Sequence, residues 1–474
     1  MIENKYKKYI DLYILVWSIT MLFHRISFIN WAFSFFGITA TVFCLLQILF
    51  PKRRVFFLIA LISNVIFIFN QLDIFVVNHI FFEWLVNIII LLIVSYYYSK
   101  SRIEKSEFKK YHDEIWIISS SFVRKGLIIL YFFVVLHKLN FDFFNPEISC
   151  GALFFDELLV QYNLNKLHAL NNFYNLNILF FRRASIYFTL FSEILIPLLL
   201  LFKRTRGYGL LYGIIFHVIL ALYLHNGVFS FSALILCSYV CFFNTNTVNR
   251  FSELNKKKYF FLIIVLSFVF LVLYFLLGYF KSNDINFIAF GLAFFLSYAL
   301  LYLYNFIIGF KDKVYIKSSN NNLSRNNYII VFGIIITIIN GFSPYLGLKT
   351  ENTFSMFSNL KTENNKTNHL FIPNNLQVFS YQTRIATIKS TNIKRLKLYV
   401  DTNKLIVMFE LIKIINSQED DFELTFVCNN KLFKIKKVNG QVFNFSDLDL
   451  NQSYLELKFF KFRPIYKNKN FCQH

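Results

Sequence analysis

Long apolar runs separated by short polar segments dominate the first 346 residues. A helix that crosses the hydrocarbon core of a bilayer needs about 20 predominantly apolar residues, and runs of this length recur along the chain. The pattern therefore predicts an all-α, multi-pass membrane bundle of about eleven spans. The expected spans lie at 9–26, 30–50, 54–71, 74–98, 115–138, 185–202, 208–225, 228–244, 259–280, 285–309 and 328–346.

Two other parts of the chain have a different pattern. Residues 139–184 are mixed polar and aromatic, which predicts a re-entrant or surface helix, for example around 152–162. In residues 347–474, short alternating segments such as LKLYVDT, KLIVMFELI, FELTFVC and YLELKFF are separated by breaks containing Asn, Asp, Ser and Gly. Alternation of this kind is typical of strands. We expect three parts: helices one to four (1–114), helices five to eleven (115–346) and a small, mainly β C-terminal domain (347–474).

Basic residues between the runs predict the orientation in the membrane. Lys and Arg collect in cytoplasmic loops, which places the N-terminus and the loops after even-numbered spans in the cytoplasm. An odd number of spans then puts the 139–184 segment and the C-terminal domain outside. Arg182 and Arg183 depart from this pattern, but long loops follow the rule poorly. The basic loops contain Lys52, Arg53 and Arg54; Lys100, Arg102, Lys105, Lys109 and Lys110; Lys203, Arg204 and Arg206; Arg250, Lys256, Lys257 and Lys258; and Lys311, Lys313 and Lys317.

Composition agrees with a membrane protein. The chain is 56% hydrophobic and contains 63 Phe among 474 residues, which is not typical of a soluble protein. The net charge of +22 comes mostly from the basic loops and the tail, so the expected partner is the lipid bilayer and not a nucleic acid. The richness in Asn, Lys, Ile and Phe favours an AT-rich bacterium and therefore a bacterial plasma membrane. The six cysteines show no CxxC pair and no zinc spacing, so no metal site is predicted. Three cysteines lie in polar segments: Cys150, Cys428 and Cys472. Their redox state depends on the side of the membrane that they face.

Ionisable groups inside spans are the main functional candidates, because they are costly in hydrocarbon. Glu193 and His217 lie at similar depth in two spans joined by a short turn. A carboxylate facing an imidazole could transfer a proton, and an interhelical structural hydrogen bond is the equally open alternative. His24 and Arg25 end the first span, where snorkelling to the surface explains them. His79 and Glu83 lie one turn apart in the fourth span.

Lys138 lies at the outer end of the fifth span, where Lys is disfavoured. A desolvated, neutral lysine is a competent base, whereas snorkelling to the outer headgroups is the alternative. His137 points about 100° away on the helix, so the two need not act together. We place His137 among the candidate substrate-binding residues.

A second group of candidates follows the last span. In residues 340–373, Met356, Asn359 and His369 are candidate substrate-binding residues that could line the outer mouth of a membrane cavity. The alternative is a folded collar that docks the tail on the bundle.

Three motifs resemble one family. LHKLNFDF, SEILIPLLLLFKRTRGYGLLYGIIFHVILALYLHNGVFSF and PYLGLKTENTFSMFSNL are similar to segments of the vitamin K-dependent gamma-carboxylases and of the wider horizontally transferred transmembrane (HTTM) group, in the family's order. The resemblance covers roughly residues 10–375. It implies a quinone or quinol cofactor, with Lys138 as the base that deprotonates the quinol. It also matches His217 to the family's Phe-His helix and Glu193 to its acidic residue before Ile-Pro, for which it implies no role.

The C-terminal domain of about 125 residues is much smaller than the outer domain of the carboxylases, so the resemblance does not imply γ-carboxylation itself. Three functions remain open at this stage. The first is an enzyme that uses a quinol-like or lipid-phase cofactor. The second is a non-catalytic module for maturation, export or immunity of a secreted peptide or protein, and the third is a proton-coupled transporter that uses Glu193 and His217.

Overall fold

We describe a computed structural model of the chain. The description covers residues 6–74, 76–162, 166, 168–223, 227–254, 256–276, 283–311, 328–402, 404–443, 452–467 and 472.

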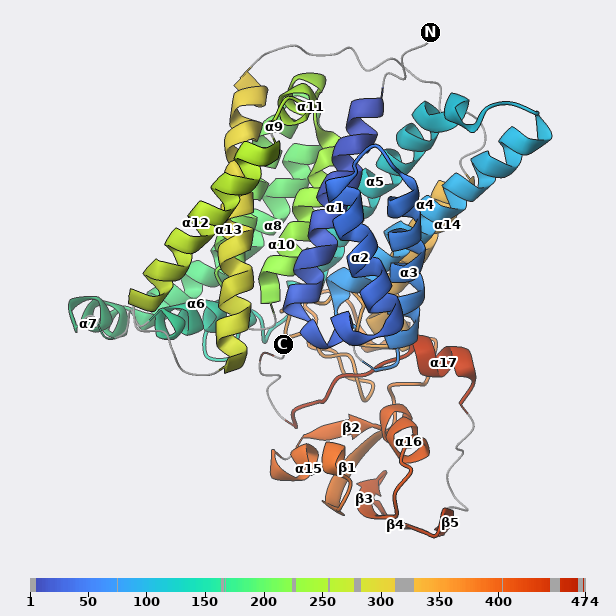
Figure 1. Ribbon diagram of the computed structural model, residues 1–474. Helices are drawn as coiled ribbons and strands as arrows, with labels where there is room; N and C mark the ends of the chain where they lie inside the picture. Colours follow the sequence, from blue (N-terminus) through green and yellow to red (C-terminus); the bar gives the residue numbers. More distant parts are fainter. Residues whose placement is uncertain are drawn as a thin grey trace.

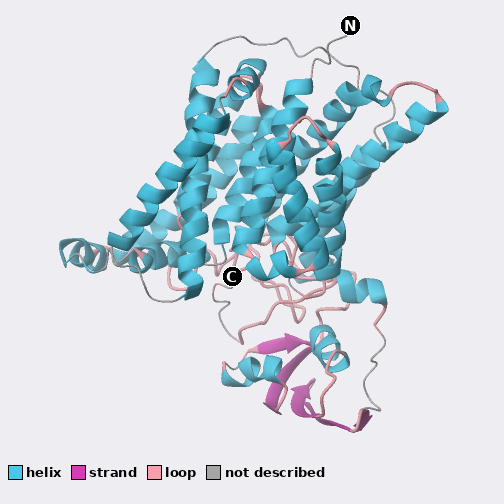
Figure 2. Ribbon diagram, viewed as in Figure 1, coloured by secondary structure: helices cyan, strands magenta, loops and turns pink. Residues whose placement is uncertain are grey.

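A bundle of roughly parallel and antiparallel helices forms most of the molecule, and a small sheet domain lies at one end of it (Figures 1 and 2). Helices occupy all eleven ranges predicted as spans. The start of α1 lies at the end of the bundle opposite the sheet domain (Figure 1). The bundle helices are α1 (Lys7–Ser27), α2 (Phe35–Leu49), α3 (Val55–Gln71), α4 (Asn78–Ile103), α5 (His112–Lys138), α8 (Ile178–Leu201), α9 (Arg206–Ala221), α10 (Val228–Tyr239), α11 (Thr245–Ser252), α12 (Lys256–Leu276), α13 (Asn283–Lys311) and α14 (Tyr328–Leu346).

Six of the described helices are long and apolar enough to cross a membrane: α1, α4, α5, α8, α13 and α14. A seventh span results if α10, extended to Phe242, is combined with α11, although the two are bent by 120°. The apolar helices α2, α3, α9 and the Lys258–Leu273 part of α12 are shorter. Helix α2 is shorter than its predicted span because Ser34 caps it by accepting the Gly37 N–H at 3.0 Å. The first residues of the predicted span therefore form a separate turn.

Small residues allow the central helices to approach closely. A Cβ added to Gly341 of α14 would lie 2.3 Å from the ring of Phe133 on α5. A Cβ added to Gly213 of α9 would lie 2.1 Å from the hydroxyl of Tyr239 on α10. Glycine at these positions is therefore a packing requirement, as is common between membrane helices.

Two short helices, α6 (Cys150–Gln161) and α7 (His168–Leu176), lie across the end of the bundle that faces the sheet domain (Figure 1). Helix α6 matches the surface helix predicted around 152–162. Helix α8 begins at Ile178, seven residues before its predicted start at 185. This extension contains Arg182, whose Nε donates to Asp156 of α6 at 2.8 Å. An acidic partner thus neutralises one of the two arginines that depart from the predicted charge pattern.

The C-terminal domain is a five-stranded antiparallel sheet in the order β2-β1-β3-β4-β5. Helices α15 and α16 contribute to its apolar core, which includes Leu396, Leu411 and Phe426. The elements are β1 (Ile385–Thr391), α15 (Lys394–Asp401), β2 (Leu405–Val407), α16 (Met408–Asn416), β3 (Phe422–Cys428), β4 (Lys431–Val438), β5 (Gln441–Phe443) and α17 (Tyr454–Phe459).

The strand prediction holds for FELTFVC, which is β3, but is wrong for two of the four segments. LKLYVDT belongs to α15, because Leu396 and Tyr399, three residues apart, are buried while Leu398 is 52% exposed. YLELKFF is α17, which a capping box formed by Ser453 and Glu456 starts. KLIVMFELI is divided between β2 and α16. These short segments are ambiguous in sequence, because their apolar residues fit both the alternation of a strand and the three-to-four residue spacing of a helix.

Between α14 and β1, residues 347–384 form an irregular layer that we call the collar. It packs on the bundle: the Phe354 N–H donates to Asn78 Oδ1 of α4 at 2.7 Å. The backbone of Phe354 has a φ of 65°, which is unusual for a bulky residue, and its side chain is fully buried. The Lys458–Asp73 ion pair, at 2.6 Å, fastens the chain after the sheet to the bundle. The geometry is that of the predicted collar.

A buried lysine in the collar should make stability depend on pH. Lys349 is 5% exposed, its Nζ lies 4.3 Å from the centroid of the Phe81 ring, and burial lowers its pKa to about 7. The lysine of the unfolded chain titrates at about 10.4, so between pH 7 and pH 10 the unfolded state binds more protons and stability rises with pH.

We expect Lys349→Met to raise the melting temperature at pH 7, with a gain that shrinks toward pH 10. Thermal unfolding of the detergent-solubilised protein at both pH values measures this gain. The exposed collar residue Lys366 provides the control, since Lys366→Met should have a small effect that is equal at both pH values. A gain for Lys349→Met that grows with pH would contradict the expected sign.

Candidate functional site

A cavity of about 440 Å³ opens among α5, α6, α8, α9 and the collar. Its wall is mostly aromatic and aliphatic, and all three candidate catalytic residues, Lys138, Glu193 and His217, line it together with Met356. A largely apolar cavity with a few polar groups is the usual form of a small-molecule site. The aromatic lining residues are Tyr131, Phe143, Phe154, Phe155, Phe181, Phe188, Phe216, Phe231 and Phe357.

Lys138 and Glu193 form an ion pair in the cavity wall. Lys138 Nζ donates to both carboxylate oxygens of Glu193, at 2.6 Å and 2.7 Å. The residues are 3% and 8% exposed, so Lys138 does not snorkel to the headgroups. The expectation of a lone, desolvated amine needs correction, because the packing of α5 on α8 places a carboxylate against it. While Lys138 is an ammonium ion, Glu193 is the proton acceptor of the pair.

No hydrogen bond joins His217 to Glu193, so the predicted pairing of the two side chains is not formed. A hydrogen bond of 2.7 Å joins His217 Nε2 to the hydroxyl of Tyr131 on α5, and a further bond of 3.1 Å joins Tyr131 to Tyr239 of α10. Both residues nevertheless line one cavity. Helix rotation, which depth does not determine, decided their partners.

Tyr131 is not among the residues predicted from the sequence, because a tyrosine is common in an apolar aromatic run and carries no charge. A signal was present: Tyr131 precedes Lys138 by seven residues, which is about two turns, so both lie on one face of α5. Tyr239 carried no comparable signal, since it reaches the site only through the packing of α10 against α5 and α9.

His137 does not line the cavity. Its Nδ1 accepts from the Tyr345 hydroxyl at 3.1 Å, and its Nε2 donates to the Thr353 carbonyl at 3.0 Å. Both ring nitrogens therefore bind α14 and the collar, and the residue is fully buried. The structure gives His137 a role in fastening the collar instead of a place at a substrate site.

Of the three collar candidates, Met356 alone lines the cavity. The side chain of Asn359 accepts the Cys150 N–H at 2.8 Å and donates to the Ile148 carbonyl at 2.9 Å. His369 Nε2 donates to the Leu136 carbonyl at 2.9 Å. Asn359 and His369 thus hold the collar against the start of α6 and the end of α5.

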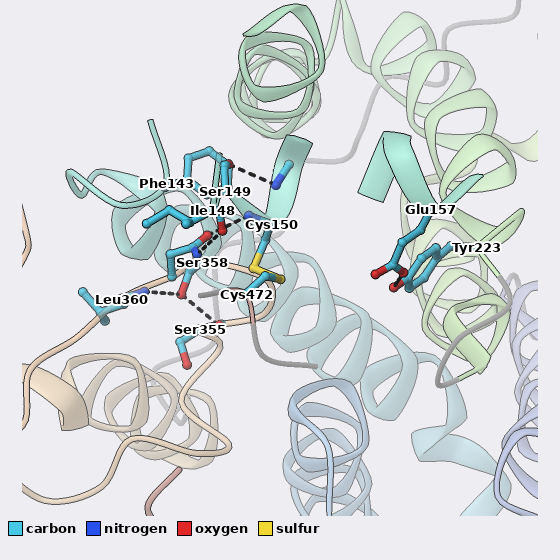
Figure 3. The surroundings of a disulfide bond; sticks show 12 residues. Phe143, Ile148, Ser149, Cys150, Glu157, Tyr223, Ser355, Ser358, Leu360 and Cys472 are labelled. Atoms are coloured by element: carbon cyan, nitrogen blue, oxygen red, sulfur yellow. Dashed lines mark hydrogen bonds between the residues drawn. A yellow bond between two sulfur atoms is a disulfide. The ribbon is translucent and has the colours of Figure 1, made fainter. Parts of the chain in front are cut away.

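A disulfide joins Cys150, in the cavity wall, to Cys472 near the end of the chain (Figure 3). Their Cα atoms lie 4.8 Å apart. In the same view, Glu157 of α6 accepts a hydrogen bond from the Tyr223 hydroxyl, which fixes α6 to the end of α9 (Figure 3). The third cysteine of the polar segments, Cys428, is free and buried in the sheet domain.

We expect Cys472→Ser to lower the free energy of unfolding by about 2–5 kcal/mol, because the disulfide closes a loop of 322 residues and restricts the unfolded chain. Melting curves without reductant measure the loss. Dithiothreitol should bring the wild-type melting temperature down to that of Cys472→Ser and leave the variant unchanged. Identical wild-type and variant curves without reductant would contradict the expectation.

A second buried polar cluster lies outside the cavity. Glu83 of α4 is paired with His24 Nε2 at 3.0 Å, and Asn64 donates to Glu83 at 2.6 Å while accepting from Arg25 at 2.8 Å. His24 and Arg25 are 2% and 6% exposed, so the snorkelling interpretation is wrong for both. The cause is α3, which places Asn64 beside the end of α1. Through these contacts, the four residues connect α1, α3 and α4.

Among the described residues, no group of three or more His, Cys, Asp or Glu is placed to hold a metal ion. Comparison with protein-family models, curated proteins and solved structures gives no match to this chain. The cavity with its Lys138–Glu193 pair is therefore the feature on which a function must be argued.

Proposed function

We propose that this is an integral membrane enzyme whose cavity binds a lipid-soluble, quinol-like molecule, with the Lys138–Glu193 pair as its acid–base group. The observation that carries the proposal is a buried ion pair in the wall of a largely aromatic cavity. Intramembrane charges of this kind are costly and usually functional. The resemblance of LHKLNFDF to the gamma-carboxylase and HTTM group supports a quinol as cofactor and Lys138 as part of the base.

The proposal requires the Lys138–Glu193 pair to carry out one proton transfer. A quinol hydroxyl in the cavity would pass its proton to the pair, either to Glu193 directly or to Lys138 after Lys138 has given a proton to Glu193. The quinol becomes an anion, and the ammonium of Lys138 stabilises it electrostatically. Aromatic rings around the cavity exclude water, which strengthens this interaction.

We further propose that eleven helices span a bacterial plasma membrane, with the N-terminus in the cytoplasm and the sheet domain outside. Two observations support this orientation. The Cys150–Cys472 disulfide lies at the end of the bundle that carries the collar, and disulfides persist in oxidising compartments. The connections after α2 and α8 lie at the opposite end of the bundle and are rich in Lys and Arg, as expected for the cytoplasmic side.

Mass spectrometry of lipids that copurify with the detergent-solubilised protein tests the proposal. A quinone or quinol should be bound to the wild type and to Leu198→Trp, a change at a 49% exposed position of α8. It should be absent from Thr189→Trp, which would fill the cavity from the same helix. A wild type with no more quinone than Thr189→Trp would overturn the quinol proposal.

The alternative of a non-catalytic module for a secreted peptide or protein has one observation in its favour. The collar and the sheet domain are fastened to the bundle by an ion pair and a disulfide, which suits a fixed docking platform. Lys138→Met would leave the cellular activity of such a module intact. The transporter alternative places Glu193 and His217 in one proton path; both side chains line the cavity, but their hydrogen bonds go to Lys138 and Tyr131.

A further inference from the structure

The cavity wall carries no net charge from its acidic and basic side chains. Lys138 and Glu193 are the only Lys, Arg, Asp or Glu among its lining residues in the described part of the chain. Each neutralises the other, because Lys138 Nζ contacts both carboxylate oxygens. Asp156 of α6 and Arg182 of α8, which neighbour lining residues in the sequence, are also paired, at 2.7 Å.

An anionic ligand would therefore find no unpaired cation in this cavity. A carboxylate or phosphate that contacted Lys138 would have to compete with Glu193, and two carboxylates would then share one ammonium in a site of low dielectric. Such an uncompensated buried charge is strongly unfavourable. A neutral molecule with a hydroxyl group can instead donate to Glu193 and leave the ion pair in place.

We propose that Glu193 is the specificity-determining residue of the cavity, and that its charge selects neutral hydroxylated ring compounds against anionic amphiphiles such as fatty acids. This inference rests on the proposed function, since it assigns the ligand class of the same cavity. It also gives Glu193 a task apart from proton transfer. Removal of the carboxylate should convert the cavity into a site for anions, centred on Lys138.

Two probes with the same ring body test the selection: 1-naphthol, which is neutral, and 1-naphthoate, which is an anion. Binding is measured by isothermal titration calorimetry of the detergent-solubilised full chain at pH 8, above the ordinary imidazole range. The wild type should prefer 1-naphthol. Glu193→Gln should bind 1-naphthoate at least about tenfold more tightly than the wild type does, because the Lys138 ammonium can then donate a charge-assisted hydrogen bond to the ligand carboxylate.

The matched control is the double variant Lys138→Met/Glu193→Gln. Its cavity is again uncharged, so it should lose the gain in 1-naphthoate affinity. The gain cannot be attributed to misfolding, because a misfolded cavity would not acquire a new ligand. Exposed Glu423→Gln, on the sheet domain, should behave as the wild type.

The outcomes separate this inference from the proposed function. Equal binding of both probes by the wild type, or no gain of 1-naphthoate in Glu193→Gln, would overturn charge selection while 1-naphthol binding still supports a lipid-phase ligand. Failure of 1-naphthol to bind the wild type would count against the proposed function, and a gain of 1-naphthoate in Glu193→Gln would still support the role of Glu193.

Discussion

Glu193→Gln should lower the melting temperature of the detergent-solubilised protein far more than the double variant Lys138→Met/Glu193→Gln does. The single change leaves the Lys138 ammonium buried at 3% exposure without its carboxylate. Breaking a buried pair on one side costs about 3–5 kcal/mol, whereas replacing both partners with uncharged residues of similar size is often neutral. Lys138→Met alone should be destabilising for the same reason.

Thermal unfolding of the four proteins at one pH completes a double-mutant cycle. The Lys436–Glu423 pair has the same N–O distance of 2.6 Å but lies on the surface, so Glu423→Gln should leave the melting temperature unchanged within error. If the double variant were as unstable as the sum of the single variants, the two side chains would not be coupled, and the ion pair could not be the central feature of the cavity.

Glu83→Gln should be the most destabilising change outside the cavity. Glu83 is 1% exposed and is the only acidic residue in the described network with His24, Arg25 and Asn64. Its neutralisation leaves the Arg25 guanidinium buried without a counter-charge, so the cost should again be about 3–5 kcal/mol. Melting curves in detergent measure it.

Glu107→Gln, at an exposed position between α4 and α5, provides the control and should change the free energy of unfolding by less than about 0.5 kcal/mol. The double variant Arg25→Gln/Glu83→Gln should recover part of the loss, because no uncompensated charge then remains. A mild effect of Glu83→Gln together with a severe effect of Arg25→Gln would show that Asn64 alone suffices to hold the guanidinium, contrary to the network described above.

The cavity residues illustrate how far sequence reasoning reached. Lys138, Glu193 and His217 stand out in the sequence, because charged and polar groups are rare in apolar runs. Their pairing is not visible there, since Lys138 and Glu193 are 55 residues apart and meet only when α5 and α8 adopt one particular rotation. His137 shows the converse, that neighbours in sequence can lie in different surroundings. It is adjacent to Lys138 but faces Tyr345 and the collar and not the cavity.

The short segments of the C-terminal domain show a related limit. FELTFVC is identifiable as a strand because it alternates cleanly. In the sheet, β1 and β4 pair on either side of it. LKLYVDT fits both a strand and a helix, and the side chains that the domain core buries, Leu396 and Tyr399, decide for the helix. Propensity is weak over seven residues, so tertiary packing prevails.

By itself, the sequence determined the mostly helical class, the positions of the apolar helices along the chain, the surface helix near 152–162 and the ionisable residues within apolar runs. These properties depend on local hydrophobicity, which neighbouring residues encode. Only the tertiary structure decided that Glu193 pairs with Lys138, that Tyr131 pairs with His217, that Glu83 joins His24 and Arg25 in one network, and that Cys150 meets Cys472. Such contacts depend on helix rotation and on packing between segments far apart in the chain, which no local pattern records.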